Sequence, residues 1–249
     1  MAIVRAAGGS GGARRLLIHA VSVGEVNTLR GLVPMLRDAG VEVVVATTTD
    51  TGLSRARSLF AESALGRDEP GKPGVRVVRF ALDLSASVRR FLDAVRPDAV
   101  ALVELEIWPN FMRECERRGI PVAVINGRLS SRSYKGYRRF RRLLAPSFGR
   151  LSFAAVQDDA YAERFRAMGV GDVRVTGSMK WDAVTPTAPG TAFPEADALA
   201  VTLGIDRSRP LVVAGSTGPG AGKGEDSEEQ LLHRVCPTGV QLLCAPRRP

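Results

Sequence analysis

The sequence is poor in the residue types that most often bind metals or crosslink secreted proteins. It has two histidines and three cysteines in 249 residues. Cys115, Cys236 and Cys244 show no spacing typical of zinc ligands. These absences argue against a zinc site and a disulfide framework, and they predict a protein of a reducing compartment. We expect neither a bound metal nor a cofactor.

Long apolar runs are also absent, since none reaches the ~18–20 residues that a membrane-spanning helix needs. Residues 1–14 are rich in Gly, Ala and Arg and lack the apolar core of a secretory signal, so we interpret them as a disordered leader. With 45% hydrophobic residues the chain can bury a core. We therefore expect a soluble protein whose only membrane contact is at its surface.

Negative charge is scarce in one segment of this basic chain, whose formal net charge is +9. Residues 128–150 hold eight Lys and Arg, interleaved aromatic and aliphatic residues, and no acid. Such a segment can lie on an anionic membrane, bind nucleic acid phosphates, or form a solvated helix face. The lack of acids disfavours the solvated face, and no nucleic-acid motif accompanies the run, so we expect no nucleic acid partner.

The chain alternates apolar runs with helical patterns, which is typical of a doubly wound α/β domain with a parallel sheet covered on both faces. A predicted helix over 27–39 follows the first strand, and further helices are expected up to Phe60 and over 85–95, 111–118 and 160–168. We assign 15–181 to this domain, 182–209 to a Pro/Thr/Ala-rich linker, and 210–249 to the start of a second domain. The predicted strands are 16–22, 41–48, 75–80, 99–103, 121–125, 151–156 and 173–176, then 210–215 and 240–245, around a helix over 225–235.

Three candidate sites follow apolar strands, where ligands of open α/β sheets gather. Glu25 in Ser22–Glu25 is a possible general base, or simply an acid favoured in a first helical turn. If 104–106 is extended, Glu104 and Glu106 face the same side, and proximity raises one pKa; the alternative is a solvated strand end. Lys180 is either an anion-binding or a solvated lysine. The Gly-rich 215–224 with Lys223 does not match a phosphate-binding loop, and no GxGxxG follows the first strand.

Seven motifs in order resemble the 3-deoxy-D-manno-octulosonic acid (Kdo) transferases, the lipid A glycosyltransferases of lipopolysaccharide synthesis. The resemblance covers nearly the whole chain from about residue 15. The motifs are HAVSVGE (19–25), TTTDTG (47–52), ELEIWPN (104–110), NGRLS (126–130), GSMKWD (177–182), GST (215–217) and APR (245–247).

The resemblance implies the GT-B fold of two Rossmann-like domains, with the acceptor bound by the N-terminal and the donor, CMP-Kdo, by the C-terminal domain. It implies inverting, metal-independent transfer of Kdo to the lipid A precursor lipid IVA at the cytoplasmic face of the bacterial inner membrane. Glu25 then matches the general base, and Glu104 and Lys180 match residues that stabilise the transition state. Matched motifs also supply the expected substrate-binding residues Ser22, Gly24, Arg128, Ser130, Ser216, Thr217, Pro246 and Arg247.

The sequence departs from the family pattern at three points. An apolar anchoring segment is missing at the start, Gly218 stands where the family has His and acidic residues, and Arg248-Pro249 replaces the continuation His-Pro-Glu-Arg. Later donor motifs lie beyond the end. We therefore expect the chain to bind CMP-Kdo poorly, and the alternative function is an acceptor-domain fragment that binds anionic lipid through 128–150.

Overall fold

The computed structural model describes residues 14–183, 193–220 and 226–247. The chain divides into two compact units, Met1–Thr185 and Pro186–Pro249, and each is described by itself. The predicted leader lies almost wholly outside the described residues, as do parts of the predicted linker and of the Gly-rich segment.

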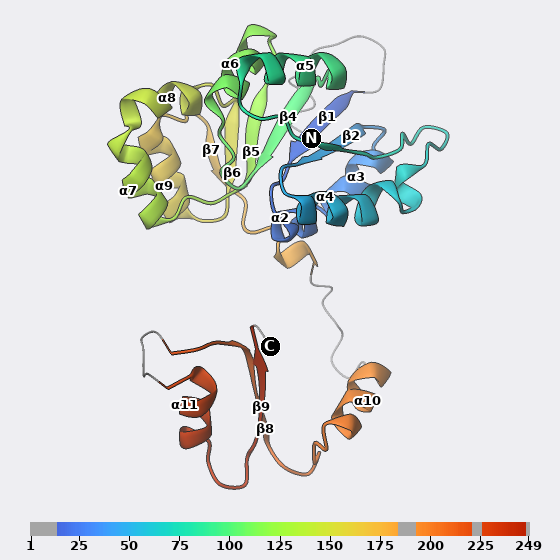
Figure 1. The fold of residues 1–249 in the computed structure, drawn as a ribbon, viewed down its shortest axis with the longest axis vertical. Helices are drawn as coiled ribbons and strands as arrows, with labels where there is room; N and C mark the ends of the chain where they lie inside the picture. The colour runs from blue at the N-terminus through green and yellow to red at the C-terminus, as the bar shows by residue number, and fades with distance from the viewer. Residues whose placement is uncertain (1–13, 184–192, 221–225, 248–249) are drawn as a thin grey trace. The chain divides into compact units, whose positions relative to one another are not determined.

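The first unit is built on a parallel seven-stranded sheet in the order β3-β2-β1-β4-β5-β6-β7 (Figure 1). This order is that of a doubly wound Rossmann-like sheet, so the predicted fold class is confirmed. All seven strands fall where apolar runs predict them. Their bounds are β1 Arg15–His19, β2 Glu42–Thr47, β3 Arg76–Arg79, β4 Ala99–Val103, β5 Val122–Gly127, β6 Phe153–Val156 and β7 Val173–Val175.

Helices cover both faces of the sheet because successive strand side chains point to opposite sides. Leu17 joins a core with the residues of α5, α6, α8 and α9, whereas Leu16 and Ile18 join a core with α2, α3 and α4. The α-helices are α2 Val23–Thr28, α3 Leu32–Asp38, α4 Asp50–Ala56, α5 Ser85–Val95, α6 Pro109–Arg117, α7 Ser131–Arg139, α8 Arg141–Gly149 and α9 Asp159–Met168. A π-helix (Arg57–Ala61) and two 3₁₀ turns, Ala64–Gly66 and Trp181–Ala183, complete the unit.

The prediction of one continuous helix over 27–39 is wrong, because the chain forms α2 and α3 with a break between them. Pro34 explains the break, since proline inside a helix removes a hydrogen bond and clashes with the preceding turn. Restarting the helix at Leu32 puts Pro34 in its first turn, where no intrahelical donor is needed. The early start of α2 at Val23 places Glu25 inside a helix.

The second unit consists of α10 Pro194–Thr202, β8 Leu211–Thr217, α11 Glu228–Val235 and β9 Gln241–Pro246. β8 and β9 pair in parallel, as a strand–helix–strand crossover requires. Helix α10 lies within the range predicted as a linker. Apolar side chains of β8 remain exposed, among them Val212 and Val213 at 45% and 60%, whereas the central strands of the first unit are buried.

No helix in the described part of the chain is long and apolar enough to cross a membrane.

His19 ends β1 as a buried member of the core. Its ring stacks on Phe80 with centroids 3.7 Å apart, and Nε2 lies 3.1 Å from Thr48 Oγ1. Burial lowers the pKa of His19 to about 3, so the ring is neutral in the folded protein. In the unfolded chain its pKa returns to about 6.5.

We predict that this difference makes the protein acid-sensitive. Between about pH 6.5 and 3 the unfolded state binds one more proton at His19, so the free energy of unfolding falls as pH falls, by up to ~1.4 kcal/mol per pH unit. In urea unfolding, His19→Phe should flatten the profile between pH 6.5 and 4.5. His233→Gln, at an exposed position of α11, should leave it unchanged. An unaltered slope in His19→Phe would contradict the assignment.

Candidate active site

The candidate site of the first unit lies where the strand order reverses. β1 pairs with β2 on one side and with β4 on the other. The segments that follow β1 and β4 therefore leave neighbouring strands at the same edge of the sheet, where open α/β sheets bind ligands. Ser22–Glu25 follows β1, and Glu104 follows β4.

Glu25 is fixed by hydrogen bonds to both of its carboxylate oxygens. The Val21 N–H donates to Oε2 at 2.8 Å and the Ser22 hydroxyl donates to Oε1 at 2.7 Å. Ser22 is also the N-cap of α2, and its Oγ accepts from the Glu25 N–H at 3.3 Å. Glu25 thus occupies a first helical turn, as the simpler interpretation proposed, and its carboxylate is oriented by the same contacts. Gly24 is exposed, and a Cβ there would meet only Ser22 Oγ at 3.8 Å.

The TTTDTG motif braces the Glu25 segment from the neighbouring loop. Thr49 caps α4, and its hydroxyl donates to the Val21 carbonyl at 2.6 Å while accepting from the Gly52 N–H at 3.1 Å. A Cβ at Gly52 would lie 2.6 Å from the same carbonyl, which no side chain tolerates. Gly52 is therefore required by a close approach of two backbones, a role that sequence reasoning did not assign.

Glu104 leaves β4 in the left-handed conformation, with φ 59°. The strand ends at Val103, so the strand alternation that was to place Glu104 and Glu106 on one side is wrong. Both carboxyls nevertheless line one pocket. The pKa of Glu104 is raised, first by burial and then by the charge of Glu25, while the charges of Lys180 and Arg128 lower it.

Glu25, Lys180 and Arg128 each act electrostatically on Glu104, so these four residues form one electrostatic cluster. The pocket itself measures about 380 Å³ and lies between the segments after β4 and β5 and helix α7. Ser130, one of the lining residues, is the N-cap of α7, and its Oγ accepts from the Ser133 N–H at 3.2 Å. The pocket is lined by Glu104, Leu105, Glu106, Arg128, Ser130, Ser133 and Tyr137.

Asn126 ties the segment that carries Lys180 to the end of β5. It is 1% exposed and left-handed, with φ 51°, and its Oδ1 accepts from the Met179 N–H at 3.1 Å. Its own carbonyl accepts from Gln157 Nε2 at 3.1 Å. Lys180, next to Met179, is itself exposed. The first residue of NGRLS is thus a positioning residue, which the sequence signalled only by the presence of the motif.

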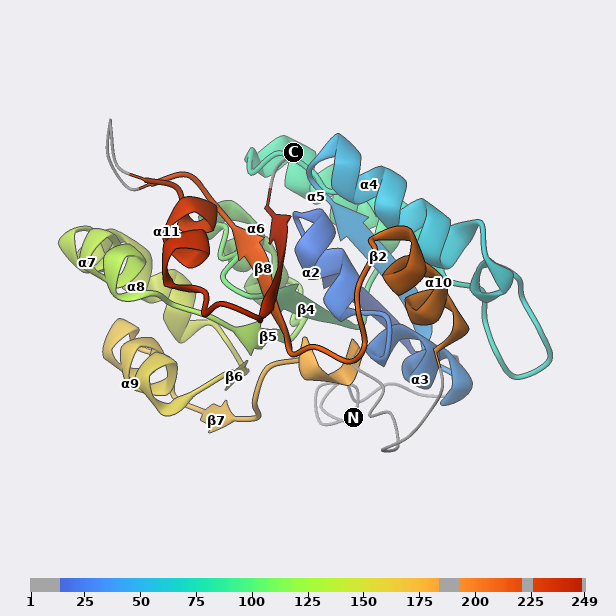
Figure 2. The same ribbon diagram turned by 90° about the horizontal axis from the view of Figure 1, so that it is seen from below.

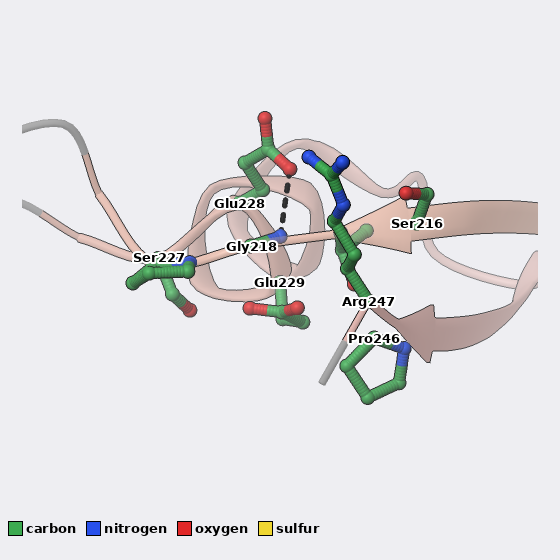
Figure 3. A pocket seen from close by; sticks show the side chains of 9 residues that line it. Ser216, Gly218, Ser227, Glu228, Glu229, Pro246 and Arg247 are labelled. Atoms are coloured by element: carbon green, nitrogen blue, oxygen red, sulfur yellow. Dashed lines mark hydrogen bonds between the residues drawn. The ribbon is translucent and has the colours of Figure 1, made fainter. Parts of the chain in front are cut away.

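The remaining predicted substrate-binding residues meet in a second pocket, in the second unit. Ser216, Thr217, Pro246 and Arg247 line a volume of about 780 Å³ together with the start of α11. Figure 3 shows Ser216, Pro246 and Arg247 around the ends of the two strands, and the Gly218 N–H donates to Glu228 Oε2 at 2.8 Å. Ser216 is left-handed, with φ 63°, and Thr217 is buried.

The basic run 128–150 contains the whole of α7 and α8, which lie beside α9 at the β6–β7 end of the sheet (Figures 1 and 2). Much of its apolar side packs on the core. Phe148 is buried there, and the partly buried Tyr134, Tyr137 and Leu144 pack against it. Phe140 and Leu143 stay 59% and 74% exposed. Six exposed basic residues form no ion pair within the described ranges; they are Arg132, Lys135, Arg138, Arg139, Arg141 and Arg142, and together with Phe140 and Leu143 we call them the basic surface.

In the described ranges, no three or more His, Cys, Asp and Glu side chains gather in a way that could hold a metal ion.

Comparison with known proteins agrees with the seven motifs. Residues 3–183 match the family model described as 3-deoxy-D-manno-octulosonic-acid transferase (kdotransferase). The chain belongs to the Kdo transferase family. A Kdo transferase of Haemophilus influenzae is 30% identical over 94% of this chain and 52% of its own length. One from Chlamydia trachomatis is 32% identical over 92% of this chain and 50% of its own length. This Kdo transferase family member thus spans about half the length of these relatives.

Solved structures resemble this family member in fold. A UDP-GlcNAc 2-epimerase from Neisseria meningitidis has a TM-score of 0.55 at 12% identity, over 92% of this chain and 64% of that one. The UDP-N-acetylglucosamine 2-epimerase from Rickettsia bellii has a TM-score of 0.53 at 12% identity, over 94% and 63%. Together with the strand order, this likeness identifies the fold as Rossmann-like and GT-B in type.

We predict that Asn126 holds the Lys180 segment in place. Asn126→Ala loses the bond to the Met179 N–H and puts a Cβ-bearing residue without a polar side chain in a left-handed conformation. Together these changes should lower the free energy of unfolding by about 2–3 kcal/mol. Asn126→Gly loses the same bond without the conformational cost and should be about 1 kcal/mol less damaging. Hydrogen exchange of the Met179 amide should speed up in both variants. Unchanged exchange would contradict this role.

Proposed function

We propose that the protein provides the acceptor-binding and base-carrying part of a Kdo transferase. In this reaction Kdo passes from CMP-Kdo to lipid IVA, with inversion and without a metal ion. The observation that carries the proposal is the cluster at the reversal of strand order, where Glu25, Glu104, Lys180 and Arg128 interact. Family membership supports the reaction class.

In the proposed mechanism, Glu25 accepts the proton of the acceptor's 6′-hydroxyl. The freed oxygen attacks the anomeric carbon of Kdo, and the bond to CMP breaks with its electron pair going to the phosphate oxygen. Fixing of both Glu25 oxygens by Val21 and Ser22 supports this role, because a base that is already oriented loses little freedom on reaching the transition state.

The cations of the cluster suit the charges of this reaction. The charges of Lys180 and Arg128 lower the pKa of Glu104, against the rise caused by burial and by Glu25, so both cations act on this carboxyl. A lysine cation beside the reacting groups stabilises negative charge that develops on the departing phosphate. Arg247, which lines the second unit's pocket, is a further phosphate ligand for the donor.

A second candidate function, binding of anionic lipid by the acceptor-binding unit alone, is favoured by the basic surface. It combines six exposed cations that form no ion pair with any described residue and two exposed apolar residues, the two properties of an interfacial membrane site. The same surface supports peripheral attachment to the cytoplasmic face of the bacterial inner membrane, where a bisphosphorylated lipid acceptor is presented.

We predict that Glu25→Gln abolishes Kdo transfer. The test joins residues 1–183 to the C-terminal half of the Haemophilus influenzae relative and follows transfer from CMP-Kdo to lipid IVA. The substituted glutamine keeps the shape of the side chain but cannot take up the proton, so the rate should fall at least ~100-fold, the usual contribution of a general base. Glu62→Gln, at an exposed position, should keep full activity. Equal thermal stability of the variants excludes unfolding, and a Glu25→Gln enzyme of normal rate would refute the proposal.

We predict that the protein binds anionic vesicles through the basic surface. Each cation near such a membrane contributes about 1 kcal/mol, so the triple variant Arg139, Arg141, Arg142→Gln should bind phosphatidylglycerol vesicles on the order of 100-fold more weakly. The matched control replaces Arg57, Arg90 and Arg113, exposed on other helices, and has the same net charge. Co-sedimentation at two salt concentrations measures binding, which should weaken with salt. Equal loss in both triple variants, or equal binding to neutral vesicles, would count against a local surface.

A further inference from the structure

Glu106 lines the pocket of the first unit, and no role has been assigned to it. The pocket presents two carboxyls, from Glu104 and Glu106, one guanidinium, from Arg128, and the hydroxyls of Ser130, Ser133 and Tyr137. This lining is suited to a polyhydroxylated ring that carries an anionic substituent. The hydroxyls and carboxyls exchange hydrogen bonds with ring hydroxyls, and a guanidinium pairs with a phosphate.

Glu106 is held at one oxygen and free at the other. The indole N–H of Trp108 donates to its Oε2 at 3.1 Å. In the described ranges its Oε1 has no hydrogen-bond partner. Trp108 is 38% exposed, so the pair sits at the edge of the pocket rather than in the core.

The surroundings of Glu106 favour its neutral form. Burial and then the charges of Glu25 and Glu104 raise the pKa of Glu106 to about 7, against the opposing hydrogen bond from Trp108. On α7, the pKa of Tyr137 is raised by burial and by the charge of Glu106. The groups facing Glu106 are therefore carboxylates from α2 and the end of β4, a neutral phenol from α7, and the Arg128 guanidinium of the same pocket.

We propose that Glu106 is a specificity-determining residue that binds the acceptor, donating a hydrogen bond from the carboxyl oxygen that Trp108 leaves free to a phosphorylated amino sugar whose anionic group pairs with Arg128. The inference rests on the proposed function, because it names how the same site recognises its acceptor. Ionised Glu106 can no longer donate and repels the ligand's anionic group. Acceptor affinity should therefore be highest below pH 6 and fall as Glu106 ionises above pH 7.

Linkage between ligand binding and proton binding sets the direction of this pH dependence. An anionic ligand that prefers the protonated carboxyl is bound with uptake of a proton wherever free Glu106 is ionised, so its affinity falls up to tenfold per pH unit above the pKa. Ligand phosphates also titrate near pH 6. The decisive quantity is therefore the ratio of wild-type to Glu106→Gln affinity at each pH, in which the ligand's own titration cancels.

The experiment uses Trp108 as the reporter, in a Trp181→Phe background that leaves it the one tryptophan of the chain. Without ligand, Trp108 fluorescence should titrate with a midpoint near pH 7 in this background and in Glu62→Gln, and the transition should vanish in Glu106→Gln. The binding probe is the deacylated, bisphosphorylated glucosamine disaccharide of lipid IVA. From pH 6 to pH 8 the ratio of wild-type to Glu106→Gln affinity should fall about tenfold.

A constant ratio, or a fluorescence transition that survives Glu106→Gln, would overturn the proposal. So would failure of the disaccharide to perturb Trp108 in any variant. Circular dichroism shows whether each variant is folded. Glu106→Asp keeps an ionisable group, so a folded Glu106→Asp variant should keep a fluorescence transition. Because binding is measured without donor, a negative result here leaves the Glu25→Gln transfer test standing, and failure of that test leaves this one readable.

Discussion

Parallel pairing of β1 with both β2 and β4 is the constraint on which the site depends. Connections on the two sides of β1 run to opposite faces of the sheet, so neither helix layer covers the carboxyl ends of β1 and β4. Glu25 and Glu104 are brought together there by the backbone, despite their like charges. Burial is the main cause of the raised pKa values of Glu104 and Glu106, and the charge of Glu25 adds to both. The charges of Lys180 and Arg128 oppose the rise at Glu104, and the hydrogen bond from Trp108 opposes it at Glu106.

Strands were the part of the fold that could be predicted well. A strand buried on both faces must be apolar throughout, and that requirement is visible in a single sequence as in Val100–Val103. The helix after β1 was predicted less well, because the 3.6-residue periodicity of Leu29, Leu32, Val33 and Leu36 continues across the break that Pro34 imposes. Helix α10 was missed because its residues face no described core and carry no amphipathic pattern.

At the site, Glu25, Glu104 and Lys180 could be selected from the sequence because each follows an apolar strand. The roles of Gly52 and Asn126 could not, because one is a 2.6 Å approach to the Val21 carbonyl and the other a bond between residues 53 positions apart. Glu106 was selected on the assumption that the strand continues through 104–106, but Glu104 adopts the left-handed conformation and ends the strand. Three of the four non-glycine residues with positive φ in the described ranges, Glu104, Asn126 and Ser216, lie at strand ends in matched motifs. Such costly conformations gather where function constrains the backbone.

Helix α7 connects the pocket with the basic surface. Its N-cap Ser130 and first-turn Ser133 line the pocket, as does Tyr137, whereas Arg138 and Arg139 near its end are exposed. At ~1.5 Å per residue, the nine residues of α7 span only about 14 Å. Under the proposed function, a membrane bound by the end of α7 therefore presents the sugar head group of its lipid close to the pocket. The acid-free composition of 128–150 then serves this geometry, because replacing Arg138 or Arg139 with an acid would weaken the membrane contact.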